Sequence, residues 1–236
     1  MTPLAIDLFC GLGGWTDGLL AESYDVVGFD IERHVYGDHR YPAQLVLQDV
    51  TTLHGRQFKD AALIVASPPC QAYSYRAMPW KRAKALPPPD NMLFEACFRI
   101  QREASEAAGR HIPMVVENVR GAQPWVGKAA WHYGSFYLWG DVPALMPMTL
   151  VRRIKSVADS YRVNENGQRS TPHITMPEID EDSGTKGYAA RLGQSMVSRR
   201  YGSKSSARKM ASAMIAKIPL PLSRHIAQVY REATRT

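Results

Sequence analysis

A cysteine and a glutamate each stand after a short apolar run, in a pattern that could support nucleophilic catalysis. Cys70 follows the run Ala61–Ala66 and a pair of prolines, and Glu117 follows Met114–Val116. Apolar runs of this length are typical of buried parallel strands, whose carboxyl ends lie at the edge of the sheet where ligands bind. A thiolate there can act as a nucleophile while a neighbouring carboxylic acid donates a proton. An isolated cysteine is more often buried and inert, so the expectation of catalysis rests on the two residues together.

Three further features suit a nucleotide-like cofactor. A glycine-rich turn, Gly11–Gly14, follows the apolar residues Leu4–Ile6, and glycines let the backbone approach a ligand closely at the start of a helix. Asp30 ends the next apolar run, where a carboxylate can accept hydrogen bonds from ribose hydroxyls. Asp49 ends the third run, where it could meet an adenine amino group. Each acid alone is more often a helix cap or a turn residue, but their occurrence at successive strand ends favours a nucleoside-binding site.

The segments that position these groups alternate between strand-like and helix-like patterns, which is typical of βαβ units and a mostly parallel sheet. The expected strands are Leu4–Ile6, Asp25–Phe29, Gln44–Leu47, Ala61–Ala66 and Met114–Val116, and the expected helices are Trp15–Glu22, Met92–Ala108, Ala207–Lys217 and Leu222–Thr234. We therefore expect an α/β fold with helices on both faces of the sheet. Residues 121–206 have poor periodicity, apart from short strand-like pieces such as Ser135–Trp139, and are expected to form a small irregular insertion.

Three blocks at these places resemble the signature blocks of the DNA cytosine-C5 methyltransferase family. They are DLFCGLGG at residues 7–14, SPPCQAYS at 67–74 and VVENVRG at 115–121, and a weaker match covers Arg208–Ala227. The resemblance is to a short member, of the kind expected in phages or small restriction-modification systems. It implies a Rossmann-like catalytic domain that binds S-adenosylmethionine and methylates double-stranded DNA. Residues 1–120 and 207–236 would form this domain, and residues 121–206 a small target-recognition region.

The resemblance also implies roles for individual residues. Carbon 5 of cytosine is too electron-poor to attack a methyl sulfonium unaided, so Cys70 would first add to carbon 6. Glu117 would protonate or hydrogen-bond ring N3, and Asn118 would hold the glutamate in register. The target base would be flipped out of the helix to reach the thiol, and the loop Gln71–Asp90 would close over the DNA. The cofactor-binding residues would be Phe9, Gly11, Leu12, Gly14, Asp30, Ile31, Asp49, Val50, Pro69, Leu93, Ser212 and Ala213, and the loop residues on DNA would be Gln71, Ser74 and Arg76.

Two departures from the family pattern leave other functions open. The family's Gln-x-Arg-x-Arg block, whose arginines face the cytosine, has no match, and Tyr133–Gly140 occupies its place without an arginine. Ser212 and Ala213 fall where the family has an asparagine and a small residue. The alternatives are an RNA cytosine-C5 methyltransferase, an enzyme that transfers a larger group such as carboxymethyl from a modified cofactor, and a non-catalytic DNA-binding homologue.

Composition and charge indicate the cellular location, the metal content and the kind of partner to expect. No apolar stretch approaches the roughly 20 residues that span a bilayer and no secretory signal is evident, so we expect a cytoplasmic protein. The resemblance implies a prokaryote or a phage-infected host cell as its source, and we expect a monomer. The three cysteines have no metal-binding spacing, so neither disulfides nor a metal are expected. The formal charge is +7, and residues 186–235 hold eleven Lys or Arg and one acid, which favours a polyanionic partner such as nucleic acid. A solvated basic surface is the alternative.

Overall fold

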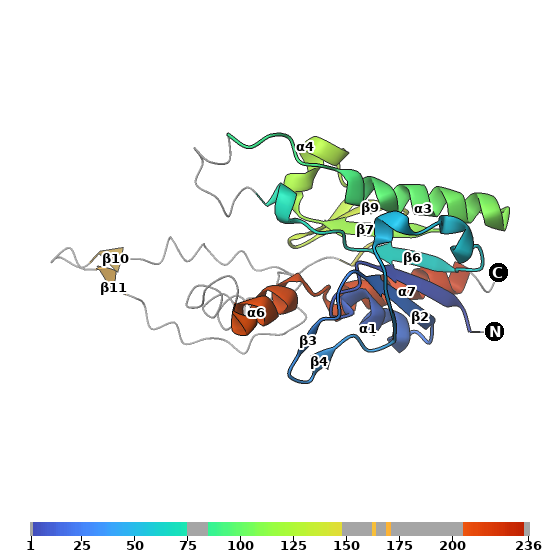
Figure 1. Ribbon diagram of the computed structural model, residues 1–236, viewed down its shortest axis with the longest axis horizontal. Coiled ribbons are helices and arrows are strands. Elements are labelled where there is room, and N and C mark those ends of the chain that lie inside the picture. Colours follow the sequence, from blue (N-terminus) through green and yellow to red (C-terminus); the bar gives the residue numbers. More distant parts are fainter. Residues whose placement is uncertain (1, 75–84, 148–161, 164–168, 171–204, 234–236) are drawn as a thin grey trace.

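A seven-stranded sheet forms the centre of the structure (Figure 1). The computed structural model describes residues 2–74, 85–147, 162–163, 169–170 and 205–233. The strand order is β5-β2-β1-β6-β7-β9-β8, in which β9 and β8 are antiparallel to their neighbours and the others are parallel. The strands span Leu4–Leu8 (β1), Asp25–Asp30 (β2), Gln44–Leu47 (β5), Leu63–Ala66 (β6), Met114–Asn118 (β7), Trp131–Tyr133 (β8) and Phe136–Gly140 (β9). The predicted mostly parallel α/β sheet is confirmed.

Helices cover both faces of this sheet, as predicted. Figure 1 shows α3 and α4 on one face and α1 and α7 on the other. The α-helices span Gly14–Ala21 (α1), Met92–Ala108 (α3), Gln123–Val126 (α4), Ser206–Ala216 (α6) and Leu220–Ala233 (α7). The short 3-10 helices span Val50–Thr52 (η1), Gly55–Phe58 (η2), Gln71–Tyr73 (η3) and Arg120–Ala122 (η5). Two separate strand pairs join Val35–Tyr36 (β3) to His39–Arg40 (β4) and Arg162–Val163 (β10) to Arg169–Ser170 (β11).

Alternation along the strands divides the hydrophobic core into two layers. Ile6 and Leu8 of β1 belong to the cluster that contains Ile100 of α3. Ala5, the residue before Ile6, belongs to a second cluster, which contains Leu222 of α7. Successive side chains of a strand point to opposite faces of the sheet, so a single central strand supplies both layers.

The strand order places a crevice at the carboxyl edge of the sheet. The chain runs from β1 outward to β2 and β5, and then returns to β6 on the other side of β1 and continues to β7. At such a switch point the loops after the two central strands diverge, and open α/β sheets bind ligands between them. The loop after β1 carries Gly11 and the loop after β6 carries Cys70. The topology therefore brings the glycine turn and the cysteine block to one place.

The observed strands differ from the predicted ones in several places: β1 continues to Leu8, and β6 begins at Leu63 instead of Ala61. β2 and β7 continue through polar residues to Asp30 and Asn118, so that Glu117 lies within a strand. Residues 131–140, which were expected to lie in an irregular insertion, form β8 and β9 and extend the central sheet. The boundary expected at residue 121 is therefore not the edge of the sheet, because the antiparallel hairpin pairs with β7 and places Leu138 opposite Glu117.

Two glycines of α1 allow the C-terminal helix to lie against it. A Cβ atom on Gly14 would lie 2.3 Å from the backbone nitrogen of Ile218, and one on Gly18 would lie 2.4 Å from that of Arg224. Contacts this short do not occur with a real Cβ atom, so any larger residue would displace the segment that carries α7. Arg224 also forms a 2.6 Å ion pair with Glu22 at the end of α1. Residues 218–233 are thus packed onto the first helix.

We expect the substitution Gly18→Ala to lower the free energy of unfolding by about 1–3 kcal/mol, because the added methyl group forces α7 to shift. In a helix without this contact the same substitution would stabilise the protein by about 1 kcal/mol. The sign of the change therefore tests the packing of α7 on α1. Urea unfolding followed by circular dichroism measures it, and a stabilised variant would contradict the contact.

Candidate active site

The glycine turn between β1 and α1 is tied to the end of β2. Its backbone has positive φ angles at Phe9 (58°), Gly11 (50°) and Gly13 (78°). The Gly11 N–H donates a 2.9 Å hydrogen bond to Oδ2 of Asp30. A Cβ atom on Gly11 would meet no atom within 4 Å, so the turn requires glycine there for its backbone conformation and leaves open space above it.

The Asp30 carboxylate is held ionised by its neighbours. Oδ1 of Asp30 accepts a 3.3 Å hydrogen bond from the Glu32 N–H and lies 3.6 Å from Nε2 of His34. Burial acts to raise the pKa of Asp30, but hydrogen bonds from His34 and from the Gly11 N–H outweigh it and leave the pKa below its usual value. The same contact with Asp30 raises the pKa of His34. A carboxylate and an imidazole therefore lie together beside the glycine turn.

A cavity of about 450 Å³ lies between the glycine turn, the ends of β2 and β5, and the start of α3. This volume falls in the range of about 300–1,000 Å³ that is usual for small-molecule sites. Its lining includes all the residues that were predicted to bind the cofactor except Ser212, namely Phe9, Gly11, Leu12, Gly14, Asp30, Ile31, Asp49, Val50, Pro69, Leu93 and Ala213. Ser212 is exposed on α6, outside this lining.

Asp49 caps η1 as well as lining the cavity. Its Oδ1 accepts hydrogen bonds from the Thr51 N–H at 2.9 Å and from the Thr51 hydroxyl at 2.8 Å. These two bonds lower the pKa of Asp49, so its carboxylate is ionised. Both interpretations of an acid at a strand end, helix cap and cavity wall, apply to the same residue. Ile31, in contrast, is 74% exposed and lies in the lining only at its rim.

Several lining residues were not predicted. Glu32 and His34 are among them, and they lie only two and four residues after Asp30 in the sequence. This closeness to a predicted cofactor-binding acid could have indicated both residues. Lys217 and Ile218 come from the end of α6 and the link to α7, and reach the cavity only because α7 packs on α1. Gln71, which was predicted to contact DNA, also lines this cavity.

Cys70 lies at the start of η3, directly after the loop that leaves β6. Its carbonyl oxygen accepts hydrogen bonds from the Tyr73 N–H at 3.0 Å and from the Ser74 hydroxyl at 2.9 Å. Cys70 is partly exposed, whereas the two other free cysteines, Cys10 and Cys97, are buried. Burial raises the pKa of the Cys97 thiol to about 12, and that of Cys10 still further. Cys70 is therefore the accessible thiol of the protein.

The end of β7 is joined to the loop that carries Cys70. Glu117 and Asn118 are 6% and 1% exposed. Nδ2 of Asn118 donates a buried 3.0 Å hydrogen bond to the carbonyl oxygen of Pro68, two residues before Cys70. This bond fixes the distance between the strand that holds the carboxyl group and the loop that holds the thiol.

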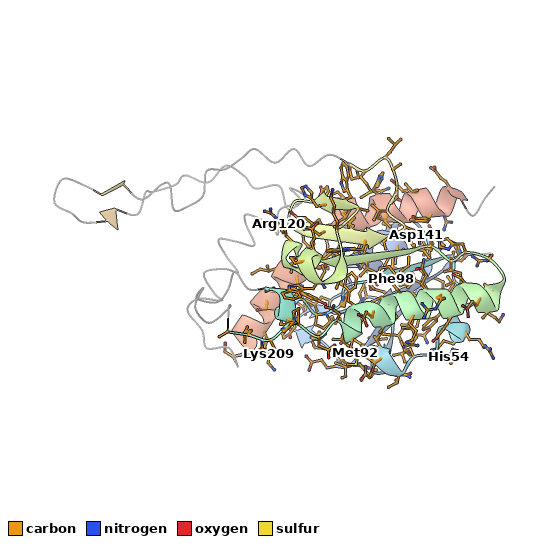
Figure 2. All side chains as sticks on the ribbon, turned by 90° about the horizontal axis from the view of Figure 1, so that it is seen from above. His54, Met92, Phe98, Arg120, Asp141 and Lys209 are labelled. Atoms are coloured by element: carbon orange, nitrogen blue, oxygen red, sulfur yellow. The ribbon has the colours of Figure 1, made fainter. Side chains whose placement is uncertain are left out.

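The remaining residues predicted to contact DNA are only partly placed. Ser74 is engaged by its bond to the carbonyl oxygen of Cys70, and Arg76 lies outside the described residues. Figure 2 shows Lys209 and Arg120 toward the left of the molecule, Met92 near the middle at the start of α3, and Asp141 farther to the right. Arg120 follows β7 directly, so it lies beyond the carboxyl end of that strand.

A buried polar network lies beneath the glycine turn. Asp7 of β1, which is 1% exposed, accepts a 2.6 Å hydrogen bond from the hydroxyl of Thr16, and that hydroxyl lies 2.7 Å from the Tyr41 hydroxyl. Burial raises the pKa of Asp7 to about 7, although the bond from Thr16 acts in the opposite direction. Asp7 therefore keeps its proton in the folded protein at mildly acidic pH.

We expect the contribution of Asp7 to the stability of the protein to fall as the pH rises from about 4 to 7. In this window the folded state retains the proton of Asp7 while the unfolded state has lost it, and the free energy of unfolding falls by at most about 1.4 kcal/mol per pH unit. Urea unfolding at pH 5 and pH 8 should show a smaller difference for Asp7→Asn than for the unmodified protein. The exposed Asp25→Asn is the control, and an Asp7→Asn variant with an unchanged pH dependence would contradict this account.

The part of the chain that contains these motifs matches one known protein family. Residues 4–124 match the family described as C-5 cytosine-specific DNA methylase. The chain belongs to this family. The matched range contains the glycine turn, Cys70, Glu117 and Asn118, and the predicted family is thus confirmed. No curated protein matches the chain.

One solved structure has a similar fold over nearly the whole chain. The S. pombe Dnmt2 methyltransferase is 14% identical, with a TM-score of 0.50 and 99% of each chain covered. A DNA modification methyltransferase encoded within an E. coli prophage is 24% identical over 51% of this chain, with a TM-score of 0.35. DNMT2 of Spodoptera frugiperda is 17% identical over 53% of this chain, with a TM-score of 0.36. The chain spans 33% of the length of the prophage enzyme and 38% of that of the insect protein in these matches.

The cavity suits the cofactor that methyltransferases of this family normally use, S-adenosylmethionine. Asp30 and Asp49 offer ionised carboxylates to hydroxyl and amino donors, while Leu12, Val50 and Leu93 supply apolar surface. Among the described residues, no group of three or more His, Cys, Asp or Glu could hold a metal ion. In the same part of the chain, no helix has the length and apolar character that crossing a membrane requires.

Proposed function

We propose that the chain transfers a methyl group from S-adenosylmethionine to carbon 5 of cytosine in double-stranded DNA. The hydrogen bond from Asn118 to the Pro68 carbonyl carries this proposal, because it holds the strand end of Glu117 against the loop of Cys70. The cofactor cavity adjoins the same loop, since Pro69 and Gln71 on either side of Cys70 are in its lining. A nucleophile, an acid and a donor site are therefore arranged around one crevice.

The chemistry assigned to the protein begins with its thiolate. The sulfur of Cys70 adds to carbon 6 of the cytosine, and Glu117 donates a proton or a hydrogen bond to ring N3, where the added electron pair would otherwise leave negative charge. Carbon 5 thereby becomes an enamine carbon that can attack an electrophile. S-adenosylmethionine, when bound, supplies the methyl group. Loss of the carbon 5 proton to water and elimination of the Cys70 thiolate then restore the aromatic ring.

Access to the substrate requires base flipping. A base inside the duplex cannot reach a thiol in a loop at the sheet edge, and turning it out costs a few kcal/mol. We assign DNA recognition to the residues between Gly140 and α6, most of which lie outside the described part, and we retain residues 71–90 as the loop that contacts DNA. The net charge of +7 supports binding to the phosphate backbone.

Tritium transfer from labelled S-adenosylmethionine tests the proposal. Duplex DNA and RNA of matched sequence are incubated with the protein and digested to nucleosides, which are then identified by mass spectrometry. We expect labelled 5-methylcytosine from the DNA. A product from RNA alone would assign the protein to RNA cytosine methylation, and a heavier adduct would indicate transfer of a larger group.

A trapped complex tests the covalent step directly. An oligonucleotide with 5-fluorocytosine at the target position cannot lose the carbon 5 substituent as a proton, so the adduct should remain attached to Cys70. Denaturing electrophoresis and peptide mapping would locate it. Methylated product without any trapped complex would contradict the assigned mechanism.

A further inference from the structure

We propose that Tyr73 and Asn91 form a positioning pair that orients Cys70 and couples it to the cofactor cavity, a proposal that rests on the proposed function. The Tyr73 hydroxyl donates a 2.9 Å hydrogen bond to Oδ1 of Asn91. Tyr73 lies in η3, and its backbone N–H donates to the carbonyl oxygen of Cys70. The tyrosine is 3% exposed, so its hydroxyl has little competition from water. One side chain thus anchors the turn that begins at the nucleophile.

The turn is also held from the side of β7. A Cβ atom on Gly121 would lie 2.2 Å from the carbonyl oxygen of Tyr73, so the backbone after the Glu117 strand is packed directly against η3. Tyr73 and Ala122 belong to one hydrophobic cluster, together with Phe94 of α3. Because backbone packing prevents the turn from moving toward β7, the hydroxyl bond to Asn91 determines its position on the α3 side.

Asn91 connects this turn to two other parts of the site. Its Nδ2 donates a 3.2 Å hydrogen bond to the carbonyl oxygen of Trp125 in α4. Asn91 immediately precedes α3, whose first residues, Met92 and Leu93, line the cofactor cavity. Figure 2 shows Met92 at this start of α3. An asparagine is required for both bonds, because its amide accepts from the tyrosine and donates to the carbonyl at the same time.

The pair therefore offers a mechanical link between cofactor and nucleophile. A ligand that contacts Met92 and Leu93 restrains the start of α3, and Asn91 passes this restraint to Tyr73 and the turn of Cys70. Neither Tyr73 nor Asn91 lines the cavity or is assigned a contact with the reacting atoms. Their role is to position the thiol.

The variant Tyr73→Phe tests the pair, since it removes only the hydroxyl. We expect kcat for methyl transfer to fall about threefold to tenfold, the effect of one lost hydrogen bond, while the KM for S-adenosylmethionine changes less than about twofold. Tyr24→Phe is the matched control, because Tyr24 is also 3% exposed and its hydroxyl bonds to the carbonyl oxygen of Ala227 on the α7 side of the sheet.

The alkylation rate of Cys70 gives a readout that does not depend on catalysis. The buried Cys10 and Cys97 should not react in the folded protein, so iodoacetamide reports on Cys70 alone. We expect S-adenosylhomocysteine to change this rate in the unmodified protein and in Tyr24→Phe, and to change it about threefold less in Tyr73→Phe. If the protein transferred no methyl group at all, this measurement would still test the pair.

A double-mutant cycle separates the hydrogen bond from general loosening. The variant Asn91→Ala removes the bond to Tyr73 and also the bond to Trp125, so it should reduce the ligand-dependent change at least as much as Tyr73→Phe does. The double variant should show no further loss beyond Asn91→Ala, because the bond that Tyr73→Phe removes is already absent. Additive effects would overturn the proposal. So would a Tyr73→Phe variant whose kcat and alkylation response equal those of Tyr24→Phe.

Discussion

The variant Cys70→Ala is expected to transfer no methyl group above background, a loss on the order of 10⁴-fold or more, as is found when an enzyme nucleophile is deleted. Without addition of sulfur to carbon 6, carbon 5 of cytosine stays electron-poor and cannot attack a methyl sulfonium. Tritium incorporation into DNA measures the loss. Binding of S-adenosylmethionine, followed by calorimetry, should be retained, because Cys70 is not in the lining of the cavity.

Cys97→Ala is the control for this loss. Cys97 is fully buried on α3, and its Sγ lies 3.4 Å from the carbonyl oxygen of Leu93. Its replacement should lower the melting temperature but leave methyl transfer within about twofold, since the thiol is remote from solvent and its pKa is raised by burial. Persistent activity in Cys70→Ala would end the covalent mechanism.

The variant Glu117→Gln is expected to lower kcat by about 10²–10⁴-fold, the range for loss of a positioned acid. Glutamine has nearly the same shape, so the pairing of β7 with β9 opposite Leu138 should persist. The amide has no acidic proton for ring N3, and charge that develops there on addition of the thiolate would be less well stabilised. Steady-state kinetics at a fixed concentration of duplex DNA measures the change.

Glu95→Gln provides the matched comparison, because Glu95 is an exposed carboxylate on α3. It should retain full activity. Trapping with 5-fluorocytosine adds a second readout, since Glu117→Gln should form the covalent complex more slowly while binding DNA normally. Equal trapping rates for Glu117→Gln and Glu95→Gln would remove Glu117 from the addition step.

Local patterns in the sequence predicted the elements that carry strong periodicity. The apolar spacing of Leu93, Cys97 and Ile100 predicted α3 with the bounds that are observed, Met92–Ala108, because one face of this helix is buried over its whole length. Strand ends were predicted too short at Asp30 and Glu117. Polar residues at these positions look like the start of a loop, but the hydrogen bonds of the sheet continue through them.

The parts of the site that depend on distant contacts could not be predicted in this way. The signature blocks located Gly11 and Cys70 at the crevice, because each follows a strand and the order of parallel strands brings their ends together. Nothing in the local pattern indicated Asn91, whose partners lie 18 and 34 residues away. Lys217 was also missed, since its place at the cavity depends on how α6 and α7 return to α1.

The packing of α7 on α1 has a consequence for protein synthesis. Ala213, Lys217 and Ile218 form one wall of the cavity, although the glycine turn opposite them is made about 200 residues earlier. During translation the first strands and helices emerge from the ribosome well before this wall exists. A nascent or prematurely terminated chain would hold the cysteine and glutamate blocks but lack the part of the cavity lining that Ala213, Lys217 and Ile218 supply.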